Sequence, residues 1–413
     1  MLLLKTQQFM LRFFEKSSKR CAVAALALGA LLLGCGGSDL SQPPGTIAGL
    51  SPAARVGAQI FSDPGLSASG KQSCASCHDP ANAHAQPNRL AAQLGGADGA
   101  VAGFRATPSL RYLSANPAFS FDKDGTAIGG FNRDGRAQSL AEQAKRPLLA
   151  SHEMANASKE ELVGRLKQAR YVEQFRLVFG ASVLDNPEQA FDRVAFALQQ
   201  FQKEDPAFHP FDSKYDQFLA GRIPLDAAEL RGLALFNDPA KGNCMACHNS
   251  ARGADGAAPL FTDFSFDNLG VPRNTRIAAT ANPLYFDLGL CGPDRTDLAA
   301  RADVCGAFKV PTLRNVATRK VFFHNGVFTT LKDVIGFYVR RDTNPEEWYP
   351  LAFDGSVVKF NDLPAQFHIN VNRTEGPYNR QPGMAPALSS REIDDLIKFL
   401  GTLNDADQPQ PQS

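Results

Sequence analysis

The spacing of apolar residues along the chain predicts a mainly helical protein. Residues 159–179 and 187–203 carry apolar side chains three or four residues apart, as one face of a helix requires. A third helix is predicted near the C-terminus, where Ser389 and Glu392 have the spacing of a capping box. The apolar face of this last helix consists of Ile393, Leu396, Ile397 and Leu400.

One pattern occurs twice in the chain. Residues 57–64 (GAQIFSDP) and 232–239 (GLALFNDP) each predict the end of an amphipathic helix that stops at Asp-Pro. This repeat indicates two similar domains with a boundary near residues 205–225. The 34 Gly and 27 Pro predict long irregular connections, such as residues 92–136, which have room for a short hairpin.

Both ends of the chain are expected to lie outside the folded part. Basic residues followed by the apolar stretch 21–34, too short to span a bilayer, predict a signal peptide at residues 1–35. The end of this stretch resembles a bacterial lipobox, which implies lipidation of Cys35, attachment to the outer membrane and a flexible tether at 36–50. An ordinary secretory signal is the alternative. The polar, Pro- and Gln-rich residues 403–413 predict a disordered tail.

Composition excludes two classes of protein. Hydrophobic residues make up 44% and charged residues 21% of the chain, so global disorder is excluded. The 43 Lys and Arg balance the 42 Asp and Glu. We therefore expect no nucleic-acid partner, and contact with a membrane only through the N-terminal lipid.

The cysteines carry the most specific signal. Two segments, 74–78 and 244–248, have the pattern Cys-x-x-Cys-His, which is typical of covalent c-type haem attachment. The two thiols add to the haem vinyl groups, and the adjacent His binds the iron. A redox dithiol or a zinc site is the alternative, but neither needs His directly after the second Cys. The predicted attachment residues and iron ligands are Cys74, Cys77 and His78, and Cys244, Cys247 and His248.

Two further cysteines, Cys291 and Cys305, lie in a polar part of the chain. In an oxidising compartment they are expected to form a disulfide, because unpaired thiols are uncommon in exported proteins. Two separate thiols remain the alternative.

A pair of covalent haems allows two kinds of function. If both irons have six ligands, the protein only transfers electrons. If one iron keeps an open position, it can activate peroxide, and the open side then needs an acid/base group to move protons.

The chain resembles the bacterial di-haem cytochrome c peroxidase and MauG family. The resemblance implies a mainly α fold with two cytochrome c-like haem domains in one chain and long irregular loops. It implies an open, peroxidatic haem in an N-terminal domain at 51–210 and a six-coordinate haem in a C-terminal domain at 211–402. The matching stretches are residues 73–80, 134–136, 147–154, 268–270, 308–316 and 324–326.

The resemblance also implies roles for residues on the open side of the first haem. The family places a Gln, a Pro and a Glu there, and Gln143, Pro147 and Glu153 keep that spacing. Glu153 is the expected acid/base residue, since a carboxylate can take a proton from hydrogen peroxide and return it to the leaving oxygen. A solvated carboxylate at a helix end is the alternative.

The sixth ligand of the second haem distinguishes branches of the family. Peroxidases have Met 14 residues after the His of a His-x-Gly turn, whereas MauG-like enzymes have Tyr. Here Tyr338 lies 14 residues after His324. The resemblance thus implies a bis-ferryl state, formed with hydrogen peroxide, that oxidises Trp of a protein partner. A core Tyr, with Met384 or a His as ligand, is the alternative.

The chain departs from the family between the haems. Arg133 stands where relatives often have Trp. The Asn that binds an inter-haem calcium is replaced by Ala106, and the segment that supplies backbone oxygens contains Arg319 and Lys320. Calcium is therefore doubtful, and a guanidinium or ammonium group is expected to link the haem propionates instead. Solvated basic side chains are the alternative.

Residues 338–350 resemble a narrower group, the MbnH-type enzymes associated with methanobactin operons. That resemblance implies conversion of Trp to kynurenine in a periplasmic partner. Trp348, the only Trp of the chain, is expected to be a packed aromatic residue, with a role as an exit for oxidising equivalents as the alternative. His84, shortly after the first motif, is expected to be a solvated loop residue.

Three functions follow from these patterns. The favoured one is a periplasmic enzyme that uses hydrogen peroxide to oxidise side chains of a partner protein. The second is a peroxidase that receives electrons from a small cytochrome or cupredoxin. The third, an electron carrier with both irons saturated, is disfavoured because the first haem has no evident sixth ligand.

Overall fold

The folded part of the chain begins just before its first helix. The structure, a computed structural model, describes residues 49–410. The predicted signal peptide, Cys35 and most of the predicted tether lie outside these residues. At the end of that tether, Leu50 is buried in a hydrophobic core. The tether prediction was therefore wrong for Leu50, whose apolar side chain is covered by the helices that follow.

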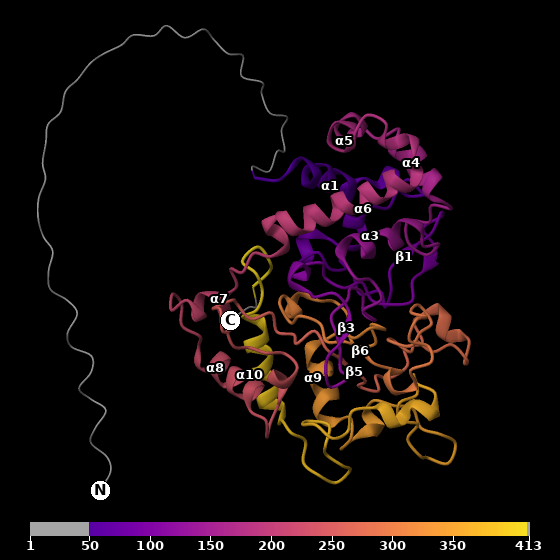
Figure 1. Cartoon of the computed structure of the whole chain (residues 1–413). Coiled ribbons are helices and arrows are strands. Elements are labelled where there is room, and N and C mark those ends of the chain that lie inside the picture. Colours follow the sequence, from indigo (N-terminus) through magenta and orange to yellow (C-terminus); the bar gives the residue numbers. More distant parts are fainter. Residues whose placement is uncertain (1–48, 411–413) are drawn as a thin grey trace, which may run out of the picture. The chain divides into compact units, whose positions relative to one another are not determined.

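The helices of the first half of the chain pack against one long helix, α6. Figure 1 shows α1 and α3 beside α6, and both helices contact it, as does α4. The prediction of a helix at 187–203 is confirmed by α6. The predicted helix at 159–179 is divided into α4 and α5, because residues 167–171 form tighter turns with bonds between residues three apart. The bounds are α1 Pro52–Ser62, α2 Cys74–Cys77, α3 Leu140–Leu149, α4 Lys159–Leu166, α5 Val172–Phe179 and α6 Pro187–Glu204.

The helices of the second half form another group, in which α10 contacts α8 and α9. The predicted capping box is present, because the Ser389 side chain accepts from the Glu392 backbone and the Glu392 side chain accepts from the Ser389 backbone. The bounds are α7 Lys214–Leu219, α8 Ala227–Asn237, α9 Leu331–Arg340 and α10 Ser390–Gly401.

The strands are short and form three antiparallel pairs among the described residues. Two pairs are hairpins within residues 92–136, where the sequence predicted irregular chain with room for a short hairpin. The third joins distant parts of the second half, with Phe266 opposite Lys309. The pairs are β1 Leu94–Gly95 with β2 Val101–Ala102, β3 Ser120–Phe121 with β4 Ala127–Ile128, and β5 Phe266–Asp267 with β6 Phe308–Lys309. The prediction of a mainly α chain is thus confirmed.

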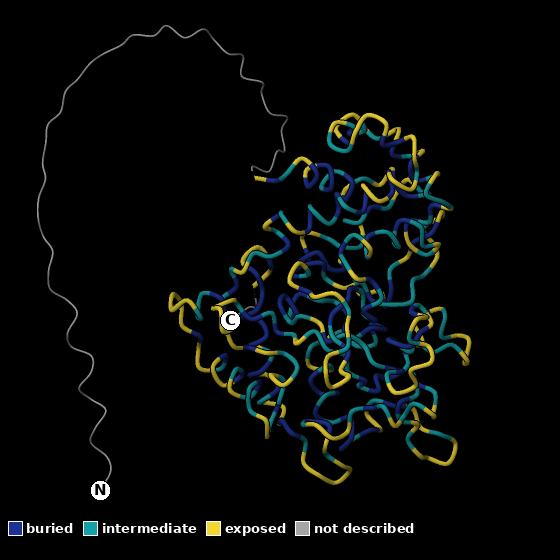
Figure 2. Tube along the Cα trace, in the orientation of Figure 1, coloured by how far each residue is buried: buried dark blue, intermediate teal, exposed yellow. Residues whose placement is uncertain are grey.

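Two large hydrophobic cores lie in this fold. One is built from residues between 50 and 208, and the other from residues between 215 and 403. In Figure 2 the buried positions run through the inside of both helical groups, and exposed positions gather on the outer turns and loops. These cores fall on either side of the predicted boundary, and the assignment of one haem to each half stays a prediction.

The C-terminal segment is ordered up to residue 410, which corrects the prediction of a disordered tail at 403–413. The carboxylate of Asp405 is fully buried. It accepts hydrogen bonds from Arg111 at 2.7 Å, from Asn315 at 2.6 Å and from the hydroxyl of Tyr112. The polar composition that indicated disorder therefore supplies buried ionic contacts. Residues 411–413 lie outside the described part.

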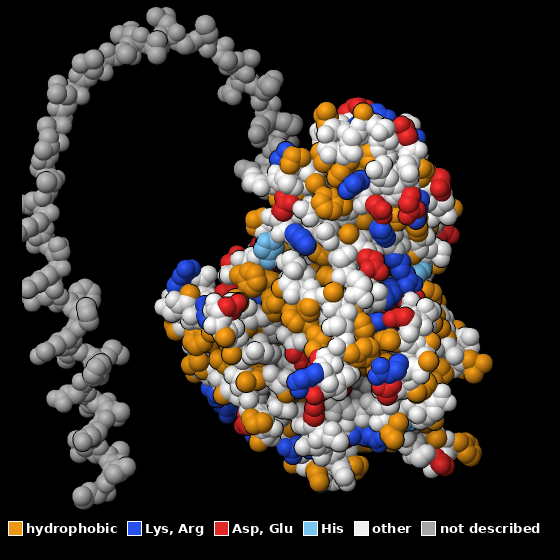
Figure 3. All heavy atoms as spheres, in the orientation of Figure 1, with side chains coloured by type: hydrophobic (Ala, Val, Ile, Leu, Met, Phe, Trp, Pro, Cys, Tyr) orange, Lys and Arg blue, Asp and Glu red, His pale blue; other side chains and the backbone are white. Residues whose placement is uncertain are grey.

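The surface agrees with the balanced composition. On the face shown in Figure 3, acidic and basic side chains are interspersed. None of the helices within residues 49–410 is both long enough and apolar enough to cross a bilayer.

Candidate functional site

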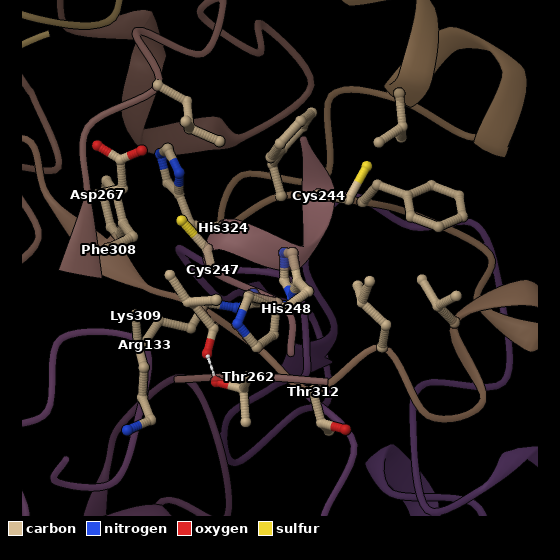
Figure 4. A pocket seen from close by; sticks show the side chains of 18 of the residues that line it. Arg133, Cys244, Cys247, His248, Thr262, Asp267, Phe308, Lys309, Thr312 and His324 are labelled. Atoms are coloured by element: carbon tan, nitrogen blue, oxygen red, sulfur yellow. Dashed lines mark hydrogen bonds between the residues drawn. The ribbon is translucent and has the colours of Figure 1, made fainter. Parts of the chain in front are cut away.

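Each Cys-x-x-Cys-His motif lines a cavity of its own. The first cavity, of about 180 Å³, is lined by the motif at 74–78. The second cavity, of about 320 Å³, is lined by the motif at 244–248. Figure 4 shows Cys244, Cys247 and His248 around the second cavity.

The same local turn positions the reactive groups of both motifs. The backbone N–H of His78 donates to the carbonyl of Cys74 at 2.8 Å, and His248 donates to Cys244 at the same distance. This closed turn brings two thiols and an imidazole to one side of the backbone. The preceding helices, α1 and α8, end at equivalent Asp-Pro steps, so the repeat in the sequence corresponds to a repeat in local structure.

Both histidines are held by backbone carbonyls through Nδ1. His78 Nδ1 lies 3.0 Å from the Pro108 oxygen and 3.3 Å from the His84 oxygen, and His248 Nδ1 lies 2.7 Å from the Phe261 oxygen. Burial lowers the pKa of His78 to about 4 and also lowers the pKa of His248. Both rings are therefore neutral, with Nε2 free, which is the form that binds iron.

The four motif cysteines are free thiols in the structure. Burial raises the pKa of Cys74 and Cys244 to about 12, and that of Cys77 to about 11. Burial therefore disfavours the thiolate form that a redox dithiol uses. Two thiols and a neutral imidazole at the wall of each cavity fit the attachment of a haem.

The structure places Gln143, Pro147 and Glu153 together on the first cavity. The first two lie on α3, and Glu153 follows in the turn after this helix. That turn is closed by the bond from Glu153 N–H to the Ala150 carbonyl at 2.9 Å, and by a bond from Met154 N–H to the Pro147 carbonyl at 3.0 Å. The predicted spacing therefore brings the three residues to one place.

The carboxylate of Glu153 has no hydrogen-bond donor bound to it among residues 49–410. His152 Nε2 lies 3.9 Å from a Glu153 carboxylate oxygen, burial lowers the pKa of that imidazole, and 43% of the Glu153 side chain is exposed. Burial raises the pKa of Glu153, while Arg146 and Arg136 oppose that rise. Such a carboxylate can accept a proton and return it.

A charged group that the sequence did not reveal completes the wall of the first cavity. Cys291 and Cys305 are joined in a disulfide. Asp294, in the loop that they close, lines the first cavity and pairs with Arg146 at 2.6 Å and Arg136 at 3.3 Å. No local motif marks these residues, because the contacts join parts of the chain that are far apart in sequence.

Tyr338 lines the second cavity together with the motif at 244–248. It lies on α9, where its ring stacks on Phe323 at 5.8 Å and lies 5.7 Å from the ring of Tyr378. Burial raises the pKa of Tyr338, and the nearby Asp267 raises it further. Met384, the alternative ligand, is 52% exposed and does not line this cavity.

Two other residues singled out in the sequence are packed aromatic side chains. Trp348 lies 5.7 Å from Phe328 and 5.8 Å from Phe337 in edge-on contacts, which agrees with the packing prediction. His84 is buried, with its ring 4.1 Å from Phe208. The prediction of a solvated loop residue was therefore wrong for His84, since the loop turns its ring into the first core.

Two of the three basic residues expected between the haems lie at the cavities, and Lys320 lines neither. Arg133 lines both cavities, and Arg319 lines the second. Arg133 and Lys309 are both labelled at the second cavity in Figure 4.

Comparisons with known proteins agree with this site. Residues 51–223 match the family model described as di-haem cytochrome c peroxidase. The methylamine utilization protein MauG of Paracoccus denitrificans is 36% identical, over 93% of this chain and 95% of that protein. The cytochrome c551 peroxidase of Nitrosomonas europaea is 29% identical, over 80% of this chain and 87% of that protein.

Solved structures lead to the same family. The diheme peroxidase BthA of Burkholderia thailandensis is 38% identical, with a TM-score of 0.81, and the match covers 88% of this chain and 89% of that one. A MauG-like protein associated with microbial copper homeostasis is 24% identical, with a TM-score of 0.60 over 90% and 96% of the two chains. That second likeness shows the fold alone, so the narrower resemblance of residues 338–350 stays a prediction. The chain belongs to the family of di-haem cytochrome c peroxidases and MauG proteins.

Proposed function

We propose that this haem-dependent oxidoreductase carries two covalent haems and uses hydrogen peroxide to oxidise side chains, above all Trp, of a partner protein. The family membership supports di-haem peroxidase chemistry. The two thiols and the neutral imidazole at each cavity support covalent attachment at Cys74 and Cys77, and at Cys244 and Cys247. When bound, the haems supply an iron that binds peroxide and the electrons that reduce it.

Glu153 is the proposed proton carrier of the reaction. Its carboxylate faces the first cavity without a fixed hydrogen-bond donor. It takes the proton from the inner oxygen of hydrogen peroxide and returns it to the outer oxygen, which leaves as water. Gln143 and Pro147, which line the same cavity, position the peroxide and limit the entry of water.

Tyr338 on the second cavity is the observation that carries the proposal. Among residues 49–410, no Met lines that cavity. An anionic oxygen ligand stabilises oxidised iron and lowers its reduction potential relative to Met. A haem with such a ligand is a poor acceptor for electrons from a small donor protein, and it is suited to holding oxidising equivalents for a larger partner.

A simple peroxidase is the second candidate. In that case a small cytochrome or cupredoxin supplies two electrons, and hydrogen peroxide is reduced to water. The similarity to the cytochrome c551 peroxidase of Nitrosomonas europaea favours this candidate. Glu153 has the same role in both reactions.

Peroxide added to the oxidised protein distinguishes the two candidates. Protein loaded with two haems, in the fully ferric state, is mixed with one equivalent of hydrogen peroxide, and its visible and near-infrared spectra are recorded. We expect a long-lived near-infrared band and a shifted Soret band without prior reduction. A protein that reacts only after one haem has been reduced is a simple peroxidase.

The variant Tyr338→Met tests whether Tyr338 is the iron ligand at the second cavity. We expect it to lose the reaction of the fully ferric protein and to change the spectrum of one haem, because a neutral sulfur ligand favours the reduced iron. Tyr285→Phe is the control, since Tyr285 lines neither cavity. A Tyr338→Met protein with the spectrum and reactivity of the wild type would exclude Tyr338 as the ligand.

We also propose that the protein works in the periplasm, held at the outer membrane by a lipid on Cys35. The lipobox-like sequence before Cys35 and the disulfide between Cys291 and Cys305 support this location. Replacement of Cys35 by Ala should move the protein from the membrane fraction to the soluble periplasmic fraction. Unchanged fractionation would contradict the lipid anchor.

A further inference from the structure

Two guanidinium groups lie at the cavities without a carboxylate partner. Arg133 lines both cavities and Arg319 lines the second. Within residues 49–410 neither forms a salt bridge. Their neighbour Arg105 differs, because it pairs with Asp134 and Asp287, each at 2.6 Å. Asp134 and Asp287 are therefore already paired, and neither neutralises Arg133 or Arg319 through a salt bridge.

Each of the two side chains makes one hydrogen bond to the same short backbone segment. Arg133 Nε donates to the Ala106 carbonyl at 3.0 Å, and Arg319 donates to the Thr107 carbonyl at 2.9 Å. A guanidinium has five N–H donors, so most donors of both groups remain available. The two guanidinium groups are therefore fixed at neighbouring carbonyls, those of Ala106 and Thr107.

The surroundings of Arg133 and Arg319 disfavour the charged form of both side chains. Burial lowers the pKa of Arg133 to about 9, with Arg319 and Arg105 contributing, and burial lowers the pKa of Arg319 to about 10. A buried cation needs an anionic partner, because its desolvation is otherwise uncompensated. A carboxylate in either cavity can reach Arg133, since Arg133 lines both.

We propose that Arg133 and Arg319 bind the propionate carboxylates of the two haems and occupy the place of a divalent cation between them. The inference rests on the proposed binding of two haems. The planar fork of each guanidinium matches a carboxylate, and one group on both cavities connects the two cofactors.

Metal analysis of the wild-type protein is the first test. Protein loaded with two haems is passed through buffer without added calcium and analysed for metals. We expect two iron atoms per chain and no stoichiometric calcium, and we expect EGTA to leave the haem spectra unchanged. One calcium per chain, or a spectrum that changes with EGTA, would overturn the proposal. No variant is needed, so a folding defect cannot confuse this result.

Charge removal is the second test. The variants Arg133→Met and Arg319→Met are compared with Arg319→Lys by redox titration and by resonance Raman spectra of the propionate bending modes. We expect both Met variants to shift a haem midpoint potential to more negative values and to change the propionate modes, because a positive charge that favours the added electron is lost. Arg319→Lys keeps the charge and should shift the potential less than Arg319→Met.

Arg222→Met is the matched control, because it removes one exposed positive charge that lines neither cavity. It should leave potentials and Raman modes as in the wild type. If the two Met variants, loaded with two haems, also keep both readouts unchanged, the guanidinium groups do not bind the propionates. Potentials are measured without peroxide, so this failure is distinct from a failure of the proposed oxidation of a partner.

Discussion

At the scale of single residues, the motif alone predicts two iron ligands, His78 and His248, but the orientation of their rings depends on distant carbonyls. His78 is held by Pro108 and His248 by Phe261, which are 30 and 13 residues away in the chain. A spacing pattern contains no information about such acceptors, since any residue can supply a backbone oxygen. The sequence could therefore predict that these imidazoles lie at a cavity with two thiols, and not what holds them in place.

Glu153 gives a prediction for the pH dependence of the reaction with peroxide. Because burial raises the pKa of this carboxyl, the deprotonated form is lost at a higher pH than for an ordinary Glu. The rate should fall as the pH decreases through that raised pKa. Glu153→Gln should lower the rate of the reaction with peroxide about 10²–10⁴-fold at neutral pH. It should also abolish the acid limb of the pH profile, which is the fall of the rate at low pH. Stopped-flow mixing with peroxide across the pH range measures both effects.

The control for this prediction is Glu188→Gln, an exposed carboxylate at the start of α6. It should keep the rate and the pH profile of the wild type. An unchanged acid limb in Glu153→Gln would show that another group carries the proton.

At the scale of elements, the repeated pattern before each motif has a packing reason. Gly57 of α1 and Gly232 of α8 occupy equivalent positions in the repeat. A Cβ at Gly57 would lie 2.0 Å from the Ala197 oxygen of α6, and at Gly232 it would lie 2.2 Å from the Asp395 oxygen of α10. Each glycine thus allows two helix backbones to approach closely. The sequence showed the repeat, and only the paired helices explain why both copies keep glycine.

Gly57→Ala and Gly232→Ala should each destabilise the protein. The added methyl group meets a backbone carbonyl that cannot move without separating two helices, which typically costs about 1–3 kcal/mol. Thermal unfolding of the haem-loaded protein measures the effect. Gly164→Ala on α4 is the control, because nothing lies within 4 Å of its Cβ position. Since Ala favours a helix over Gly, this control should be neutral or stabilising.

A single predicted helix at 159–179 became two because apolar spacing continues across the turn at 167–171. Periodicity alone cannot detect such a break when no Gly or Pro marks it.

One outcome would contradict the prediction for the two glycines. If Gly57→Ala and Gly232→Ala are as stable as Gly164→Ala, the helix pairs are not in close contact at these points.

At the scale of the whole molecule, the end of the chain contacts both of its halves. Asp405 binds Arg111 and Tyr112 from the first half and Asn315 from the second. Arg111 is 1% exposed and also lies 3.5 Å from His84, in the loop after the first motif. Composition indicated a disordered tail because it cannot distinguish a solvated acidic residue from one that has a buried partner.

Asp405→Ala should lower the free energy of unfolding by about 3 kcal/mol, because it leaves a buried guanidinium with only one of its two carboxylate partners. Denaturant unfolding followed by far-UV circular dichroism provides the measurement. Asp394→Ala removes an exposed partner of Lys332 and should cost under about 1 kcal/mol. Equal effects of the two substitutions would mean that the C-terminal segment contributes no more than a surface ion pair.

The position of Asp405 has a consequence for the order of folding. The Asp405 carboxylate that pairs with Arg111 lies 294 residues further along the chain. Arg111 is therefore a buried cation without this partner in any state in which the first half has folded and residue 405 has not yet reached it. A product that stops before residue 405 lacks the contact, although every residue of its first half is present.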